Sequence, residues 1–122
     1  MTAARGPRTV LLVEDDDETL GAYDHAFHGA GWIVVAARSG SDAIALVRGG
    51  LRPSAAIVDI GLPGASGFDV LREFVAASPV TRTIACSGLD DAVLVATSLK
   101  AGAAEFVPKS AGVERVVSAA TG

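Results

Sequence analysis

The sequence is poor in cysteine, lysine and aromatic residues, and each shortage excludes a class of protein. The single cysteine, Cys86, cannot form an internal disulfide or a cysteine-based metal site, and its place in a predicted strand indicates a small buried thiol. Lys100 and Lys109 are the only lysines, the arginines are scattered and the net charge is −4. We therefore expect no binding to nucleic acid, which depends on neutralising phosphates with basic side chains.

The sequence also lacks long apolar segments. No run approaches the length of a membrane span, and residues 1–8 lack the apolar stretch of a secretion signal. We therefore expect a cytoplasmic protein that does not bind a membrane. The 122 residues, half of them hydrophobic, predict one folded domain over 1–122, with no output domain in this chain.

Four short apolar runs of β type are each followed by a polar residue. The runs and the residues that follow them are 10–13 with Glu14 and Asp15, 55–58 with Asp59, 83–86 with Ser87, and 105–108 with Lys109. Segments of helical pattern separate the runs, which is the alternation expected of an α/β fold with a parallel sheet. Because parallel strands end at the same edge of a sheet, we expect these side chains to share one pocket.

The predicted elements alternate along the whole chain. The predicted strands are 8–14, 32–37, 54–59, 82–87 and 104–108, and the predicted helices are 16–29, 40–49, 67–77, 90–101 and 111–120. Ser66 and Asp69 have the spacing of a capping box and mark the start of the third helix. The buried face of that helix is predicted to consist of four side chains: Phe68, Leu71, Phe74 and Val75.

The acidic side chains at the strand ends predict a metal site. Glu14, Asp15 and Asp59 would concentrate negative charge in a small volume, and such a group attracts a cation. Oxygen ligands without sulfur or imidazole indicate a hard divalent ion, and Mg²⁺ is the expected one. Residues 16–18 continue the acidic run, but acids are favoured at a helix N-terminus and are interpreted here as a solvated cap.

Asp59 opens a glycine-rich loop over 59–67, which allows backbone to approach whatever the carboxylate binds. A carboxylate beside Mg²⁺ and an ammonium can attack phosphorus and hold an aspartyl phosphate. Phosphoryl transfer needs mainly positioning and neutralisation of the phosphoryl oxygens, which Mg²⁺, Lys109 and the Ser87 hydroxyl can share. Gly88 leaves room for the incoming group.

The motifs that carry these residues resemble the receiver domain of bacterial two-component response regulators, over essentially the whole chain. The motifs are Val-Glu-Asp-Asp at 13–16, Asp-x-x-Leu-Pro-Gly-x-x-Gly at 59–67, Ser-Gly at 87–88 and Gly-Ala-x-x-Phe-x-x-Lys at 102–109. The resemblance implies a flavodoxin-like doubly wound sheet of five strands in the order 2-1-3-4-5, with helices on both faces and the site between the first and third strands.

The resemblance also implies a role for each site residue. Asp59 is expected to be the phosphoacceptor and to bind Mg²⁺ directly with Asp15 and the backbone carbonyl of Gly61, while Glu14 acts through a coordinated water. Ser87 and Gly88 are expected to contact the phosphoryl group, as is Lys109, which Ser110 follows where family members usually have proline. Phe106 is the aromatic side chain expected to move inward after Ser87 when the phosphoryl group arrives.

The expected donor is a phosphohistidine of a sensor histidine kinase or of a histidine phosphotransfer protein. Phosphorylation is expected to remodel the face formed by 90–101, 104–108 and 111–120, which is then a surface for a homodimer or an effector. The segment 92–96 is apolar on more of its circumference than a surface helix needs, with Leu94 and Val95 as its outward candidates. Gly61 and Leu89 carry no polar group that could orient an attacking water, which predicts slow loss of the phosphoryl group.

Three alternatives use a similar architecture. A haloacid-dehalogenase-like phosphatase also has an Asp nucleophile and Mg²⁺, but it needs a second acid at the position of Gly61. A flavodoxin-like or dinucleotide-binding module would have to receive phosphate where residues 14–18 are acidic, and no glycine-rich phosphate motif is present. A pseudo-receiver would act by protein binding alone. We expect a domain that catalyses only its own phosphorylation and dephosphorylation and is otherwise not an enzyme.

Overall fold

The computed structural model describes residues 7–61 and 66–122. Part of the predicted 59–67 loop, residues 62–65, therefore lies outside the described residues. The strands are β1 (Thr9–Val13), β2 (Ile33–Ala37), β3 (Ala55–Asp59), β4 (Arg82–Ser87) and β5 (Glu105–Pro108). The helices are α1 (Asp17–Gly29), α2 (Gly40–Arg48), α3 (Gly67–Ala77), α4 (Ala92–Lys100) and α5 (Val113–Thr121), with a short 3₁₀ turn, η1 (Lys109–Ala111), between β5 and α5.

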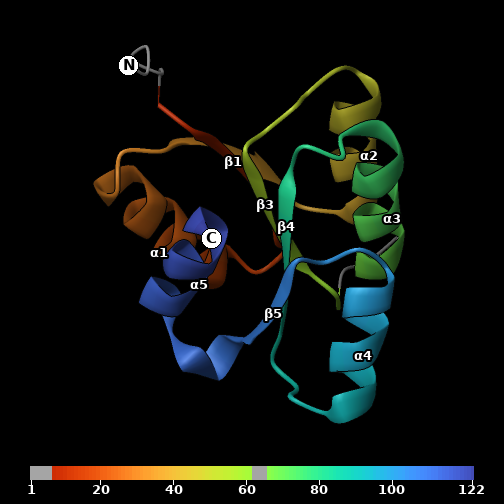
Figure 1. Ribbon diagram of the computed structural model, residues 1–122. Coiled ribbons are helices and arrows are strands. Elements are labelled where there is room, and N and C mark those ends of the chain that lie inside the picture. The colour runs from red at the N-terminus through yellow and green to blue at the C-terminus, as the bar shows by residue number, and fades with distance from the viewer. Residues whose placement is uncertain (1–6, 62–65) are drawn as a thin grey trace.

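The five strands form one parallel sheet in the order β2-β1-β3-β4-β5. Helices α1 and α5 cover one face of the sheet, and α2, α3 and α4 cover the other (Figure 1). Every predicted strand and helix is present to within three residues at each end, so the predicted α/β, flavodoxin-like architecture is confirmed. None of the described helices is both long enough and apolar enough to span a bilayer.

The core has two apolar layers because successive residues of a strand point to opposite faces of the sheet. Leu12 packs under α1 and α5, whereas its neighbour Leu11 packs under the helices of the other face. In the first layer the rings of Phe27 and Trp32 meet edge to face, with centroids 5.4 Å apart. The strands of the sheet centre, β1 and β3, are almost wholly buried, which explains their lack of polar alternation.

Helix α3 begins as predicted, but its buried face is rotated from the predicted one. Ser66 and Asp69 form both bonds of the capping box. Val70 is fully buried with Leu71 and Phe74, whereas Val75 is 53% exposed, so the assignment of Val75 to the core is wrong. The face centred on 70, 71 and 74 already covers the sheet, and the next position turns about 100° away from it.

Helix α4 also differs from the prediction. Leu94 and Val95 are half-buried, and the outward large apolar side chains are Val93 and Leu99, which are 73% and 48% exposed. Ser98 is the fully buried residue of the helix. Its hydroxyl can be buried without a partner outside the helix because it donates to the carbonyl of Leu94.

Candidate functional site

The register of the sheet brings the predicted site residues to one edge. Val13 pairs with Val58, and on the other side of β3 Asp59 pairs with Cys86. The residues directly after β1, at the end of β3, at the end of β4 and directly after β5 are therefore neighbours in space. These positions hold the residues that the sequence singled out: Glu14, Asp15, Asp59, Ser87 and Lys109.

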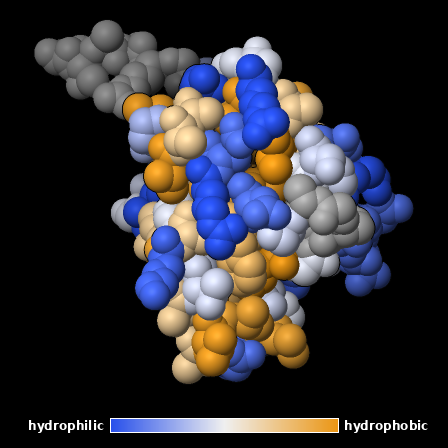
Figure 2. All heavy atoms as spheres, turned by 90° about the vertical axis from the view of Figure 1, so that its right-hand side faces the viewer, coloured by the Kyte–Doolittle hydropathy of each residue, from blue (hydrophilic) through white to orange (hydrophobic). Residues whose placement is uncertain are grey.

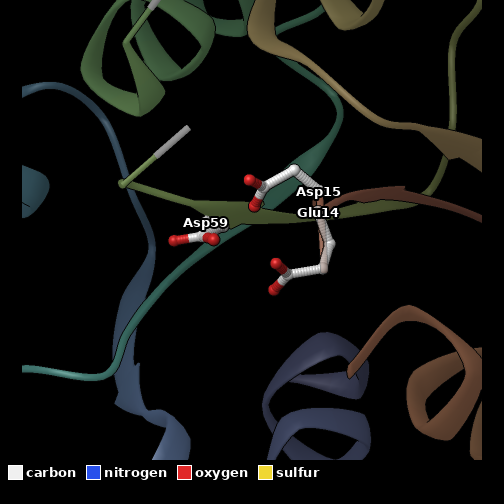
Figure 3. A group of neighbouring side chains, drawn as sticks. All are labelled: Glu14, Asp15 and Asp59. Atoms are coloured by element: carbon white, nitrogen blue, oxygen red, sulfur yellow. The ribbon is translucent and has the colours of Figure 1, made fainter. Parts of the chain in front are cut away.

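Three carboxylates converge at this edge (Figure 3). One oxygen from each of Glu14, Asp15 and Asp59 lies within 4.8 Å of the others. Glu14 and Asp59 are only 1% and 8% exposed, whereas Asp15 is exposed. Buried carboxylates at this separation repel one another, so the arrangement favours a cation among them.

Lys109 places a positive charge beside two of these carboxylates. Its ammonium nitrogen lies 2.9 Å from Oε1 of Glu14 and 3.2 Å from Oδ2 of Asp59. Burial opposes the charged form of Lys109, but the two carboxylates outweigh it and raise the pKa of the ammonium. Lys109 therefore stays protonated while joining the end of β5 to the ends of β1 and β3.

Glu14 is the most deeply buried acid of the cluster. Burial raises the pKa of Glu14, although contact with Lys109 and the Asp16 amide partly offsets the effect. Oε2 accepts the Asp16 N–H at 3.1 Å. Oε1 is close to Lys109, but among the described residues it is the buried side-chain oxygen without a directed hydrogen bond. A buried carboxylate beside two further acids, with Lys109 as the cation in contact with it, fits a site that receives another cation or its coordinated water.

The donor set fits Mg²⁺ because it consists of three carboxylates and has no sulfur or imidazole ligand. Gly61 lies two positions after Asp59, and its N–H donates to Oδ1 of Asp59 at 2.9 Å. Both oxygens of Asp59 therefore have a donor, one from the backbone and one from Lys109. The carboxylate is held in one orientation at the mouth of the site.

A glycine at the start of α3 allows the backbone to approach Asp59. A Cβ atom on Gly67 would lie 2.4 Å from Cα of Ile60 and 2.7 Å from the carbonyl oxygen of Asp59. The N–H of Ile60 also donates to the carbonyl of Cys86. The end of β3 is thus fixed between β4 and the first turn of α3, and any side chain at position 67 would displace it.

Ser87 and Gly88 stand at the end of the neighbouring strand. The Ser87 hydroxyl oxygen accepts the Leu89 N–H at 3.0 Å, and the residue is 8% exposed. A Cβ atom at Gly88 would meet nothing within 4 Å, so there is open space beside the hydroxyl. Phe106 pairs with Ala85 across the sheet and is partly buried against the core layer under α2, α3 and α4.

The rest of the acidic run has the structural role that the sequence indicates. Asp16 is the N-cap of α1, and its Oδ2 accepts from both the amide and the hydroxyl of Thr19. These bonds lower the pKa of Asp16. Asp17 is exposed and forms an ion pair with Arg38. These three interactions anchor the start of α1, and neither Asp16 nor Asp17 belongs to the cluster that contains Glu14 and Asp15.

Tyr23, a buried residue of α1, is affected by the site and was not singled out by the sequence analysis. It is 4% exposed, and burial is the first cause that raises the pKa of its hydroxyl, followed by Cys86 and then by the charges of Glu14 and Asp59. The charges of Glu14 and Asp59 therefore add to the effect of burial and disfavour ionisation of the Tyr23 hydroxyl. An apolar periodicity cannot distinguish a tyrosine under a site from any other core aromatic.

Comparison with known proteins identifies the family of the chain. The family described as the response regulator receiver domain matches residues 10–121. A cyclic di-GMP phosphodiesterase of Thermotoga maritima is 34% identical over 106 residues, which cover 87% of this chain and 28% of that protein. A probable transcriptional regulatory protein, TcrX, of Mycobacterium tuberculosis is 32% identical over 111 residues, covering 91% of this chain and 47% of that protein. The chain thus spans less than half the length of these two relatives.

A solved structure has the same fold. It is a response regulator from Burkholderia pseudomallei that holds a phosphorylated aspartic acid, a calcium ion and citrate, with a TM-score of 0.85 and 22% identity over 93% of this chain and 66% of that one. At this identity the likeness concerns the fold. Together with the family match over nearly the whole chain, it supports one conclusion: the chain belongs to the response regulator receiver domain family.

Proposed function

We propose that Asp59 is the phosphoacceptor of this receiver domain and takes a phosphoryl group from a phosphohistidine of a sensor histidine kinase or histidine phosphotransfer protein. The observation that carries the proposal is Lys109, whose ammonium contacts the carboxylates of both Glu14 and Asp59 at the edge where the strands end. A carboxylate so placed is a nucleophile with a cation beside it to neutralise a phosphoryl oxygen.

The chain's own residues would act as follows. An oxygen of Asp59 attacks phosphorus as the phosphorus–nitrogen bond of the donor breaks, and the bonding electrons stay with the imidazole. The Gly61 N–H holds the carboxylate in position, and Lys109 moves from pairing with Asp59 to pairing with a phosphoryl oxygen. The Ser87 hydroxyl, with open space at Gly88, can donate to another oxygen of the same group. Mg²⁺ bound by Asp15, Asp59 and the Gly61 carbonyl, with Glu14 through water, would supply further neutralisation of charge.

A phosphodonor experiment tests this function. The purified chain is incubated with acetyl phosphate with and without Mg²⁺, and intact mass is measured for the wild type and for Asp59→Asn. We expect one phosphoryl adduct on the wild type only, and only with Mg²⁺. Phosphate release without accumulation of an adduct would instead indicate a phosphatase, and no adduct under any condition would indicate a pseudo-receiver. The solved relative whose description includes a phosphorylated aspartic acid supports the first outcome.

The same proposal includes the output surface formed by α4, β5 and α5. Leu89 just before α4, and Val93 and Leu99 in α4, expose 66%, 73% and 48% of their surfaces. Figure 2, which views the side of the molecule formed by α2, α3 and α4, shows hydrophobic side chains gathered at its lower end, where α4 lies. Apolar side chains that gather on a surface mark an interaction site more often than scattered ones do. We assign this surface to a second copy or an effector after phosphorylation. Val93→Glu should abolish phosphodonor-induced self-association measured by light scattering or weaken binding of an effector, and a variant that leaves both unchanged would reject the assignment.

A further inference from the structure

The edge of the sheet opposite the phosphoacceptor site, where the strands begin, contains a cavity of about 380 Å³. Three arginines line it: Arg8 just before β1, Arg52 just before β3, and Arg82 at the start of β4. Its other lining residues are Trp32, Pro53, Ser54, Val80, Ala120 and Thr121, and none of them is acidic. Three of the chain's ten basic residues therefore meet in one cavity of a protein whose net charge is −4.

The backbone of the sheet fixes the positions of the three arginines. The carbonyl of Arg8 accepts the Ile33 N–H at 2.8 Å, and the Arg82 N–H donates to the carbonyl of Ser54 at 2.9 Å. The Ser54 N–H donates in turn to Thr9 at 2.9 Å. The starts of β1, β3 and β4 are therefore tied together, so the spacing of the arginines is set by the fold rather than by a loop.

Each guanidinium is also held in place while part of it stays available. Arg52 uses only Nη1, which donates to the carbonyls of Val47 and Leu51 at 2.8 and 2.9 Å. Arg82 donates from Nε to the Ala119 carbonyl at 2.8 Å and from Nη2 to Glu105. A guanidinium has five N–H donors, so anchored arginines with spare donors are preorganised to bind an anion.

Arg8 is held differently, because its guanidinium lies over the Trp32 ring, with 4.4 Å between its carbon and the ring centroid. Stacking leaves the edge of the guanidinium, where its N–H groups point, free for another partner. In the described part of the chain, the ion pairs include Arg82 with Glu105 and none of either Arg8 or Arg52. Two of the three charges in the cavity are thus uncompensated by a carboxylate.

We propose that this cavity binds a small organic polyanion, with at least two carboxylate or phosphate groups on a compact body. Several guanidiniums around one space favour a ligand with more than one anionic group, and Trp32, Pro53 and Val80 supply an apolar wall for the body of the ligand. The site is separate from the phosphoacceptor cluster, which lies at the other edge of the sheet and is acidic. It would bring a metabolite signal to the edge opposite the phosphorylation chemistry.

Calorimetric titration without Mg²⁺ tests the proposal, with pyrophosphate and propane-1,2,3-tricarboxylate as the two probes. We expect saturable binding of at least one probe, and the probe that binds more tightly tells whether the site prefers phosphate or carboxylate. Arg52→Gln and Arg8→Gln should each weaken binding about tenfold or more, because each removes a charged donor to the anion. Arg38→Gln is the matched control, since Arg38 is an exposed arginine on another surface.

Two results would overturn the proposal: no saturable binding of either probe, or equal weakening by Arg38→Gln, which would indicate a general charge effect. Lys109→Gln separates this site from the phosphoacceptor site and should leave polyanion binding unchanged. If Lys109→Gln abolishes binding, the anion occupies the other edge and the proposal is wrong. Arg52→Gln also loses two bonds to carbonyls, so its fold is checked by circular dichroism before the titration.

Discussion

The ammonium nitrogen of Lys109 lies 3.2 Å from Oδ2 of Asp59, although 50 positions separate the two residues in the sequence. This contact joins β5 to β3 across β4, and it also determines the charge of the site. The cluster contains three carboxylates, and the ammonium of Lys109 contacts two of them, so the cluster has an excess of negative charge when no cation is added. This excess of negative charge should lower the free energy of unfolding, and substitutions in the cluster can measure by how much.

Removal of a negative charge from the cluster should therefore stabilise the chain, whereas removal of the positive charge of Lys109 should destabilise it. Asp59→Asn relieves repulsion with Glu14 and Asp15 and keeps an oxygen for the Gly61 N–H, so we expect a gain of about 1 kcal/mol. Lys109→Met leaves the carboxylates without their counter-charge and should cost about 1–2 kcal/mol, between the values for exposed and buried pairs. Urea unfolding in EDTA measures both. Changes of the same sign would show that the cluster is not under electrostatic strain.

Divalent cations should stabilise the chain through the same acids. At ten times its dissociation constant, Mg²⁺ bound only to the folded state raises the free energy of unfolding by about 1.4 kcal/mol. Asp15→Asn should reduce this effect strongly. Asp17→Asn is the matched control, because Asp17 is an exposed acid two positions away that pairs with Arg38 instead. Thermal unfolding against Mg²⁺ concentration is the measurement, and an equal response of both variants would remove Asp15 from the metal site.

Two glycines offer a further paired test of how the fold supports the site. A methyl group on Gly67 would collide with the backbone of Ile60, so Gly67→Ala should destabilise the chain by about 1–3 kcal/mol and displace Asp59. A methyl group on Gly21, inside α1, meets nothing within 4 Å, so Gly21→Ala should stabilise by about 0.5–1 kcal/mol. Urea unfolding distinguishes them. A Gly67→Ala variant as stable as the wild type would contradict the close approach described here.

The sequence predicts the sheet and the convergence at its edge because both follow from local signals. Apolar runs without alternation specify buried strands, and a polar residue at the end of each strand must lie at the common edge once the strands are parallel. The face of α3 was not predictable in the same way. Both Val70 and Val75 fit an apolar stripe, and only the packing of α3 against the sheet decides that Val70 is buried and Val75 is exposed. The basic cavity escapes sequence reasoning for a similar reason, since Arg8, Arg52 and Arg82 are far apart in the chain and meet only through the register.

Cys86 provides a measure of opening at the site edge. The thiol is 1% exposed, and burial is the main cause that raises its pKa to about 12. Because the thiolate is the reactive form, iodoacetamide near pH 8.5 should modify the native chain only through opening or unfolding. The rate should rise with urea and fall when Mg²⁺ is added. Alkylation as fast as that of the unfolded chain would contradict the placement of Cys86 in the core.

The lifetime of the phosphoryl group on Asp59 should be long, because no polar side chain stands at the two positions expected to orient the attacking water. Gly61 and Leu89 lie two positions past Asp59 and Ser87, and neither side chain can orient a water for attack on phosphorus. The Leu89 side chain is 66% exposed, while its N–H is bound to the Ser87 hydroxyl, so a substitution there changes the side chain without a loss of core packing. Leu89→Gln should therefore shorten the lifetime of the adduct, and Leu89→Met should leave it unchanged. Intact mass after removal of the phosphodonor follows the decay, and rapid loss of the adduct from the wild type would show that this interpretation of positions 61 and 89 is wrong.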